Sequence, residues 1–245
     1  MTTDAKIDNF LSIMVSNEAY PSKDNLRFKY DQLFGNIDFK GKNVLEIGGG
    51  QGVFCFYAAI RGAKWVVNLE PEGAGSKSGY IEKFRLLKEE LGIHNVELIA
   101  TTFQEYNPDN IKFDIILLYN SINHLDEKAC IELRTNSVSW NSYKDIFRKI
   151  YSLSNNYAKI IIGDCSNKNL FPLLGLKNPL HKSIEWHKHQ SPIIWTKLLK
   201  ECGFCNPVLS WTTFNRFGKV GKYLFGNKYL SFFLISHFVL KMDAR

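Results

Sequence analysis

The chain has 245 residues, 45% of them hydrophobic, which is enough for one large α/β domain and too few for two full-sized ones. Its formal charge of +7 is common among ordinary enzymes, so the charge alone does not make nucleic acid a favoured partner. The longest nearly apolar run, residues 229–240, is too short to span a bilayer, and residues 1–6 lack a secretory signature. The five scattered cysteines favour reduced thiols, and we expect a cytoplasmic protein.

The first part of the chain predicts two helices that precede a sheet. Ile7, Phe10 and Met14 recur at helical spacing. A breaker at Pro21 follows, and then a second helical stretch over residues 25–34.

Residues 43–52, with the sequence NVLEIGGGQG, predict a buried strand that turns sharply into a helix. Gly48, Gly50 and Gly52 permit positive φ and let a ligand lie against bare backbone. The first free amides of the following helix would face that ligand.

The spacing of these glycines separates two kinds of nucleotide site. In the dinucleotide pattern G-x-G-x-x-G, the third glycine would fall on Val53, so that pattern is broken. Glu46, Gly48, Gly50 and Gly52 instead resemble the E/D-x-G-x-G-x-G motif of class I S-adenosylmethionine-dependent methyltransferases. The resemblance implies a Rossmann-like, seven-stranded, mostly parallel sheet with helices on both faces and an antiparallel last strand. It also implies S-adenosylmethionine as cofactor.

The next two strands extend the expected cofactor site. Residues 64–70 form a strand ending in Glu70, about twenty residues beyond the glycine turn, where a carboxylate can accept hydrogen bonds from both ribose hydroxyls. After a third strand, residues 96–100, the family commonly has an acid near the adenine, and this chain has Thr102 and Phe103 there instead.

The strongest strand, residues 113–119, is followed by a segment that resembles the loop after the fourth strand in small-molecule methyltransferases. The resemblance places Asn120 beneath the sulfonium side of the cofactor. His124 is a candidate general base, because an imidazole can accept a proton from a hydroxyl at neutral pH. A histidine bonded to backbone beneath the cofactor is the alternative role.

The fifth strand, residues 158–165, ends in Asp164, and the irregular residues 165–190 follow at the same edge. We interpret residues 165–190 as a substrate-side insertion, with His187, His189 and Asp164 as further catalytic candidates. Residues 212–231, basic and aromatic, form a second such insertion.

The end of the chain predicts a helix from Pro192, capped by Ser191, and then a closing hairpin. The sixth strand is expected over residues 207–211 and the seventh over residues 232–241. Basic residues gather here, which leaves open an anionic substrate, a membrane surface or a solvated face: Arg216, Lys219, Lys222, Lys228, Lys241 and Arg245.

These elements predict a single methyltransferase domain over residues 1–245, with a helical cap at 1–40 and a cofactor-binding core at 41–164. The predicted cofactor contacts are Glu46, Gly48, Gly49, Gly50, Gly52, Glu70, Thr102, Phe103 and Asn120. No metal is expected, since His181, His187, His189 and Cys165 match no compact ligand spacing.

The predicted activity is methyl transfer, at oxygen, to a small-molecule or glycan-like acceptor. The catalytic motif of amino-group DNA methyltransferases is missing, which makes nucleic acid an unlikely acceptor. A nicotinamide-dependent oxidoreductase and a non-catalytic S-adenosylmethionine-binding protein are the alternatives. The sequence does not determine the oligomeric state.

Overall fold

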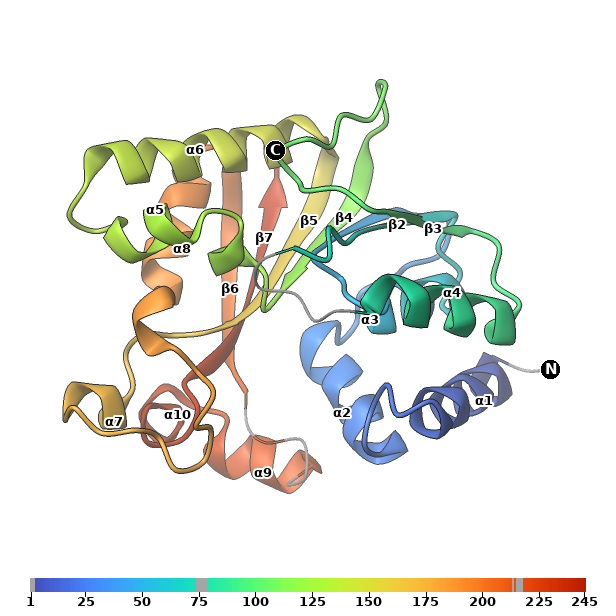
Figure 1. Ribbon diagram of the computed structural model, residues 1–245, viewed down its shortest axis with the longest axis horizontal. Coiled ribbons are helices and arrows are strands. Elements are labelled where there is room, and N and C mark those ends of the chain that lie inside the picture. Colours follow the sequence, from blue (N-terminus) through green and yellow to red (C-terminus); the bar gives the residue numbers. More distant parts are fainter. Residues whose placement is uncertain (1–2, 74–78, 213, 215–217) are drawn as a thin grey trace.

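The computed structural model describes residues 3–73, 79–212, 214 and 218–245. Within these residues seven strands form one sheet (Figure 1): β1 (Asn43–Ile47), β2 (Trp65–Leu69), β3 (Val96–Ile99), β4 (Phe113–Tyr119), β5 (Ser154–Cys165), β6 (Phe204–Trp211) and β7 (His237–Ala244). Their order is β3-β2-β1-β4-β5-β7-β6, with β1 to β5 parallel and β7 antiparallel to both of its neighbours. The predicted fold class is confirmed.

Helices cover both faces of the sheet, because the strands alternate apolar side chains between two cores. One face packs against α1 (Thr3–Ser16), α2 (Lys23–Leu33), α3 (Val53–Ile60) and α4 (Tyr80–Leu91). The other packs against α5 (Glu127–Glu132), α6 (Ser137–Ser152) and α8 (Pro192–Glu201) (Figure 1). In β4, Ile115 and Leu117 enter the first core, while Ile116 and Leu118 enter the second.

Two helix starts show how local sequence sets the elements. Ser22 caps α2 by accepting a hydrogen bond from the amide of Asn25, so this helix begins two residues earlier than predicted. Pro192 occupies the first turn of α8 as expected, but Ser191 makes no side-chain capping bond.

The predicted seventh strand over residues 232–241 is wrong at its start. A short helix, α10 (Lys228–Phe233), occupies the first part of that run, because the side chain of Asn227 accepts hydrogen bonds from the amides of Tyr229 and Leu230. Ser236, at φ 47°, then turns the chain into β7.

The sixth strand also begins earlier than predicted, at Phe204. It lies at the sheet edge, and its register against β7 shifts between Cys205 and Val208. Pro207 lies within this irregularity, where no ladder hydrogen bond is required of it.

The remaining elements lie in the connections at the carboxyl ends of the strands. They are η1 (Ile122–His124) after β4, α7 (Leu170–Leu173) and η2 (Trp186–Lys188) after β5, and α9 (Gly218–Phe225) and α10 between β6 and β7. No helix in the part of the chain that the structure describes is long and apolar enough to cross a bilayer.

Candidate functional site

The turn after β1 approaches the turn after β4 closely, and Gly48 makes this approach sterically accessible. Gly48 has φ 72°, and a Cβ there would lie 2.7 Å from Cβ of Ser121. The hydroxyl of Ser121 donates a 2.6 Å hydrogen bond to the carbonyl of Ile47. This hydrogen bond and the close approach at Gly48 hold the ends of β1 and β4 side by side.

Gly49 is required by packing and not by its backbone conformation. A Cβ at Gly49 would lie 2.7 Å from Cδ of Glu46 and closer still to Oδ1 of Asn68. Asn68 is fully buried, and its amide nitrogen donates to the carbonyl of Gly50 at 3.0 Å. The bare backbone of the turn is therefore held from below by a side chain of β2.

Glu46 is buried at the end of β1. Its carboxyl accepts a 2.8 Å hydrogen bond from the thiol of Cys55 in α3. Burial, which this hydrogen bond offsets in part, raises the pKa of Glu46 to about 8. The neutral form of this acid is favoured in the fold.

Glu70, at the carboxyl end of β2, lies against the glycine turn. Its carboxylate accepts hydrogen bonds from the amides of Gly50, at 2.8 Å, and Glu72, at 3.0 Å. A carboxylate has about four lone-pair sites, so Glu70 retains capacity for two further donors such as ribose hydroxyls. This residue fits the predicted cofactor role.

A cavity of about 640 Å³, here called the first cavity, runs along these strand ends. Its volume lies in the range of sites for drug-sized ligands. It brings together eight of the nine predicted cofactor contacts: Glu46, Gly48, Gly49, Gly50, Glu70, Thr102, Phe103 and Asn120. Gly52 does not line it. A Cβ at Gly52 would lie 2.5 Å from the ring of Phe84, so this glycine instead allows α3 and α4 to pack.

Thr102 lines the first cavity, and its hydroxyl donates to the carboxylate of Glu105 at 2.9 Å. The backbone carbonyl of Phe103 accepts a 3.0 Å hydrogen bond from Lys149 of α6. The strand-end segment predicted to lie near adenine is thus held by its own turn and by a helix.

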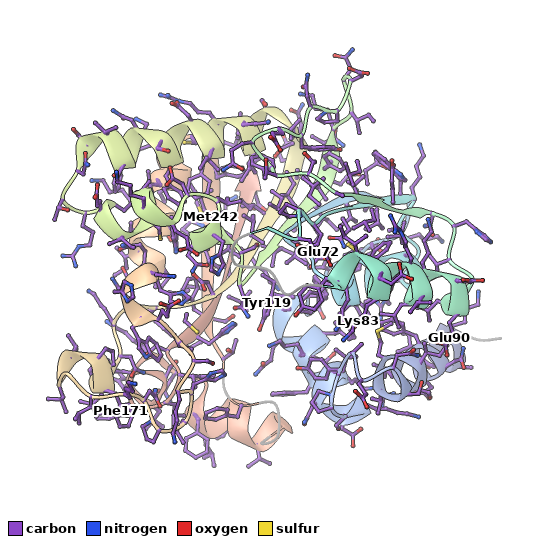
Figure 2. All side chains as sticks on the ribbon, viewed as in Figure 1. Glu72, Lys83, Glu90, Tyr119, Phe171 and Met242 are labelled. Atoms are coloured by element: carbon purple, nitrogen blue, oxygen red, sulfur yellow. The ribbon has the colours of Figure 1, made fainter. Side chains whose placement is uncertain are left out.

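A second cavity, of about 370 Å³, opens beside the first. Tyr119, Asn120 and His124 line both, so the two cavities meet where β4 ends. Tyr119 lies near the centre of the view in Figure 2, between the two groups of helices. Asn120 adopts φ 52°, an uncommon conformation for a residue other than glycine, at this junction.

His124 has a carboxylate partner at the junction. Its Nδ1 lies 2.6 Å from Oε1 of Glu127, and Lys188 of η2 forms an ion pair with the other oxygen at 3.1 Å. The hydrogen bond with His124, followed by that with Lys188, holds the pKa of Glu127 below its usual range. Beside an ionised Glu127, Nδ1 is the donor of the ring, and in the neutral imidazole Nε2 is then the acceptor.

A second histidine and carboxylate pair lies at the wall of the second cavity, which His189 lines and Asp164 does not. Nδ1 of His189 is 3.0 Å from Oδ1 of Asp164, which is fully buried at the end of β5. The other oxygen of Asp164 has no hydrogen-bond partner among the described residues. His187 is exposed and lines neither cavity. The structure therefore brings His124 and His189 to the site, connects Asp164 to it only through His189, and leaves His187 outside.

The sequence interpretation missed several residues of the second cavity. Lys29 of α2 has its ammonium 4.5 Å from the ring centroid of Tyr119, and burial lowers the pKa of Lys29 to about 8. His237, at the start of β7, bonds the hydroxyl of Thr212 at 2.8 Å, and burial holds its pKa well below the usual value. Of Lys29, Tyr119 and His237, only Tyr119 carries a sequence signal, because it ends a predicted strand and strand ends face the ligand side of such a sheet.

Searches of protein-family models and of curated proteins find no match to this chain. Solved structures do match. An S-adenosylmethionine-dependent methyltransferase from Mesorhizobium loti aligns with a TM-score of 0.58 and 11% identity, over 84% of this chain and 93% of that one. A SAM-dependent methyltransferase from Aquifex aeolicus aligns with a TM-score of 0.57 and 12% identity, over 90% of this chain and 98% of that one. The N-methyltransferase NodS from Bradyrhizobium japonicum aligns with a TM-score of 0.53 and 11% identity, over 90% of this chain and 92% of that one.

The chain therefore has the class I S-adenosylmethionine-dependent methyltransferase fold, as the glycine motif predicts. Its sheet differs from the usual dinucleotide-binding order 3-2-1-4-5-6, because β7 inserts between β5 and β6 in the antiparallel direction. The topology disfavours the nicotinamide-dependent alternative.

Proposed function

We propose that the chain is an S-adenosylmethionine-dependent methyltransferase that methylates an oxygen of a small-molecule or glycan-like acceptor. The observation that carries this proposal is the meeting of two cavities at Tyr119, Asn120 and His124. One cavity has the residues expected around the cofactor, and the other has polar groups suited to an acceptor. Methyl transfer requires the two reactants to be aligned and water to be excluded at such a junction.

The residues of the first cavity fit the cofactor by their shape and their hydrogen-bonding groups. The glycine turn supplies bare backbone, and Glu70 would accept hydrogen bonds from the ribose hydroxyls. Thr102 and Phe103 would lie at the adenine end and Asn120 at the sulfonium end. The bound cofactor supplies a methyl group that is already activated by a sulfonium sulfur.

His124 is our proposed general base, since it lines both cavities and has a carboxylate partner. A hydroxyl acceptor must lose its proton as it takes the methyl group and the carbon–sulfur bond breaks, and Nε2 of His124 would accept that proton. Glu127, bonded to Nδ1, would orient the ring and stabilise the imidazolium that results.

His189 and Asp164 would position the acceptor within the second cavity. Their pair resembles the orienting arrangement in which a buried carboxylate fixes the tautomer of an imidazole. The cavity also presents the polar side chains of Asn123, Ser183 and Thr212, which suit an acceptor rich in hydroxyl groups.

The test combines a cofactor titration with a transfer assay. The purified chain is titrated with S-adenosylmethionine and with nicotinamide dinucleotides, and is then incubated with methyl-labelled cofactor and a fractionated cell extract. We expect S-adenosylmethionine to bind and the label to enter the metabolite or glycan fraction. Mass spectrometry of the labelled product then distinguishes a methyl ether or ester from an N-methyl group.

Each other outcome selects an alternative. Tight cofactor binding without label transfer, in an extract shown to contain the acceptor, favours a binding protein. Binding of a nicotinamide dinucleotide alone favours an oxidoreductase. An N-methyl product would correct the proposed atom, in line with the name of NodS as an N-methyltransferase.

A further inference from the structure

Two segments that flank the second cavity concentrate the positive charge of the chain. Residues 166–184 and 218–236 contain six lysines and no aspartate or glutamate, in a chain of formal net charge +7. The described lysines among them, Lys168, Lys177, Lys182 and Lys228, are all exposed, while the side chains of Lys219 and Lys222 and all of Arg216 lie outside the described residues. These two segments are here called the platform.

The platform also carries most of the large exposed apolar side chains of the described residues. Ten of the 17 large exposed apolar side chains among the described residues lie on it. Tyr223 is 89% exposed, Tyr229 77% and Leu173 67%. Clustered exposed apolar groups mark an interaction surface, whereas single ones do not.

Buried polar contacts hold the two segments together. The amide of Asn169 donates to the carbonyls of Phe232 and Leu234, each at 3.0 Å, and Asn178 donates to the carbonyl of Leu234 at 2.6 Å. The hydroxyl of Ser236 donates to the carbonyl of Lys168 at 2.8 Å. The exposed apolar groups of α7 and α10 thus stand on a fixed scaffold.

The platform forms one edge of the molecule. Figure 1 shows α7, α9 and α10 together at the bottom of the view, and α7 contacts α10. Phe171 lies in the same lower part of the molecule in Figure 2. Ile235 and His181, which belong to the platform, also line the second cavity, so the mouth of this cavity opens beside it.

We propose that the platform docks on the surface of an anionic lipid bilayer. Such a surface offers negative headgroups to the lysines and an apolar layer to the leucine and tyrosine side chains, and tyrosine favours this interface. A second copy of the same face would bring lysines against lysines, which argues against self-association. This inference goes beyond the proposed activity and does not depend on it.

The test is flotation of the full chain with lipid vesicles, without cofactor or acceptor. One set of vesicles is phosphatidylcholine alone, and in the other about a third of the lipid is phosphatidylglycerol. We expect binding to the anionic vesicles at low salt and weaker binding at high salt, because exposed charges are screened.

Two triple variants distinguish binding through the platform lysines from binding through the overall positive charge of the chain. The first triple variant should weaken binding to the anionic vesicles by at least about 100-fold; it combines Lys177→Glu, Lys182→Glu and Lys228→Glu. Each lysine near an anionic surface raises the affinity about fivefold. The matched control is Lys64→Glu with Lys83→Glu and Lys200→Glu, three exposed lysines elsewhere, which should retain most of the binding. Melting temperatures show whether both triples fold.

A third variant tests the apolar contribution. Tyr223→Ser with Tyr229→Ser should reduce binding to the anionic vesicles with the lysines intact. The proposal fails if the unmodified chain does not float with anionic vesicles at low salt, or if the two lysine triples bind equally. It also fails if the chain sediments as a dimer that the tyrosine variant dissociates, because a second copy then covers the platform.

Discussion

Nδ1 of His124 lies 2.6 Å from Oε1 of Glu127, at the place where the two cavities meet. The same carboxylate is held on its other oxygen by Lys188, which belongs to the insertion after β5. The proposed base is therefore connected to the segment that shapes the acceptor cavity.

Replacing this histidine tests its role as base. His124→Gln should lower kcat by about 10²- to 10⁴-fold, because general-base catalysis typically contributes that much, while the Kd of S-adenosylmethionine stays within about threefold. Rates are measured with the acceptor that takes up the labelled methyl group. His187→Gln is the control, since His187 lines neither cavity. A larger loss in His187→Gln than in His124→Gln would assign the base to the insertion.

Disrupting the buried pair tests how the acceptor is held. Asp164→Asn should raise the KM for the acceptor more than it lowers kcat, because His189 loses the carboxylate 3.0 Å from its Nδ1 and with it a fixed tautomer. His189→Gln should act in the same direction. If both variants lower kcat with KM unchanged, His189 acts on the reacting atoms and becomes the preferred base.

Glu70 is expected to set cofactor affinity. Glu70→Gln should weaken S-adenosylmethionine binding by about 10- to 100-fold, as each hydrogen bond to a charged group is worth about 1.5–3 kcal/mol. Calorimetric titration gives the Kd. Glu82→Gln, on the exposed side of α4, serves as control and should bind normally. Equal affinity in Glu70→Gln would remove this residue from the site.

A methyl group at Gly49 should disturb the cofactor turn. Gly49→Ala places Cβ against Asn68 and Glu46, and overpacking of this kind costs roughly 1–3 kcal/mol. We expect lower stability in urea unfolding together with weaker cofactor binding. Gly73→Ala is the matched change for stability, because a Cβ there meets nothing within 4 Å among the described residues. It is no control for cofactor binding, since Gly73 also lines the first cavity. Normal stability of Gly49→Ala would show that Asn68 has room to move.

Glu46 should make stability depend on pH. Its pKa is raised from 4.5 to about 8, so the folded chain keeps a proton that the unfolded chain releases. The free energy of unfolding should therefore fall as pH rises from about 4.5 to 8, by at most about 1.4 kcal/mol per pH unit. Glu46→Gln keeps an acceptor for Cys55 and should flatten that fall in urea titrations. The exposed control Glu89→Gln should retain it, and an equally steep fall in Glu46→Gln would contradict the assignment.

The sequence identifies the first cavity well because its signals are local. Glu46, the glycines and Glu70 stand at the ends of strands whose apolar patterns are unambiguous, and parallel strands bring their carboxyl ends to one edge. The sequence-based prediction of the start of β7 is wrong. The apolar run there suits a strand or a helix equally, and the helix cap at Asn227 favours the helix α10.

The sequence by itself determined the fold class and the place expected for the cofactor, since both follow from patterns within a few residues of each other. Only the tertiary structure decided the second cavity. Its lining residues Lys29, Tyr119, Cys165 and His237 come from α2, β4, β5 and β7, and their meeting depends on strand order and helix packing. Local propensity carries no information about those distances. The sequence therefore predicted a substrate-side insertion at residues 165–190 but not the part that Lys29 and His237 take in the cavity.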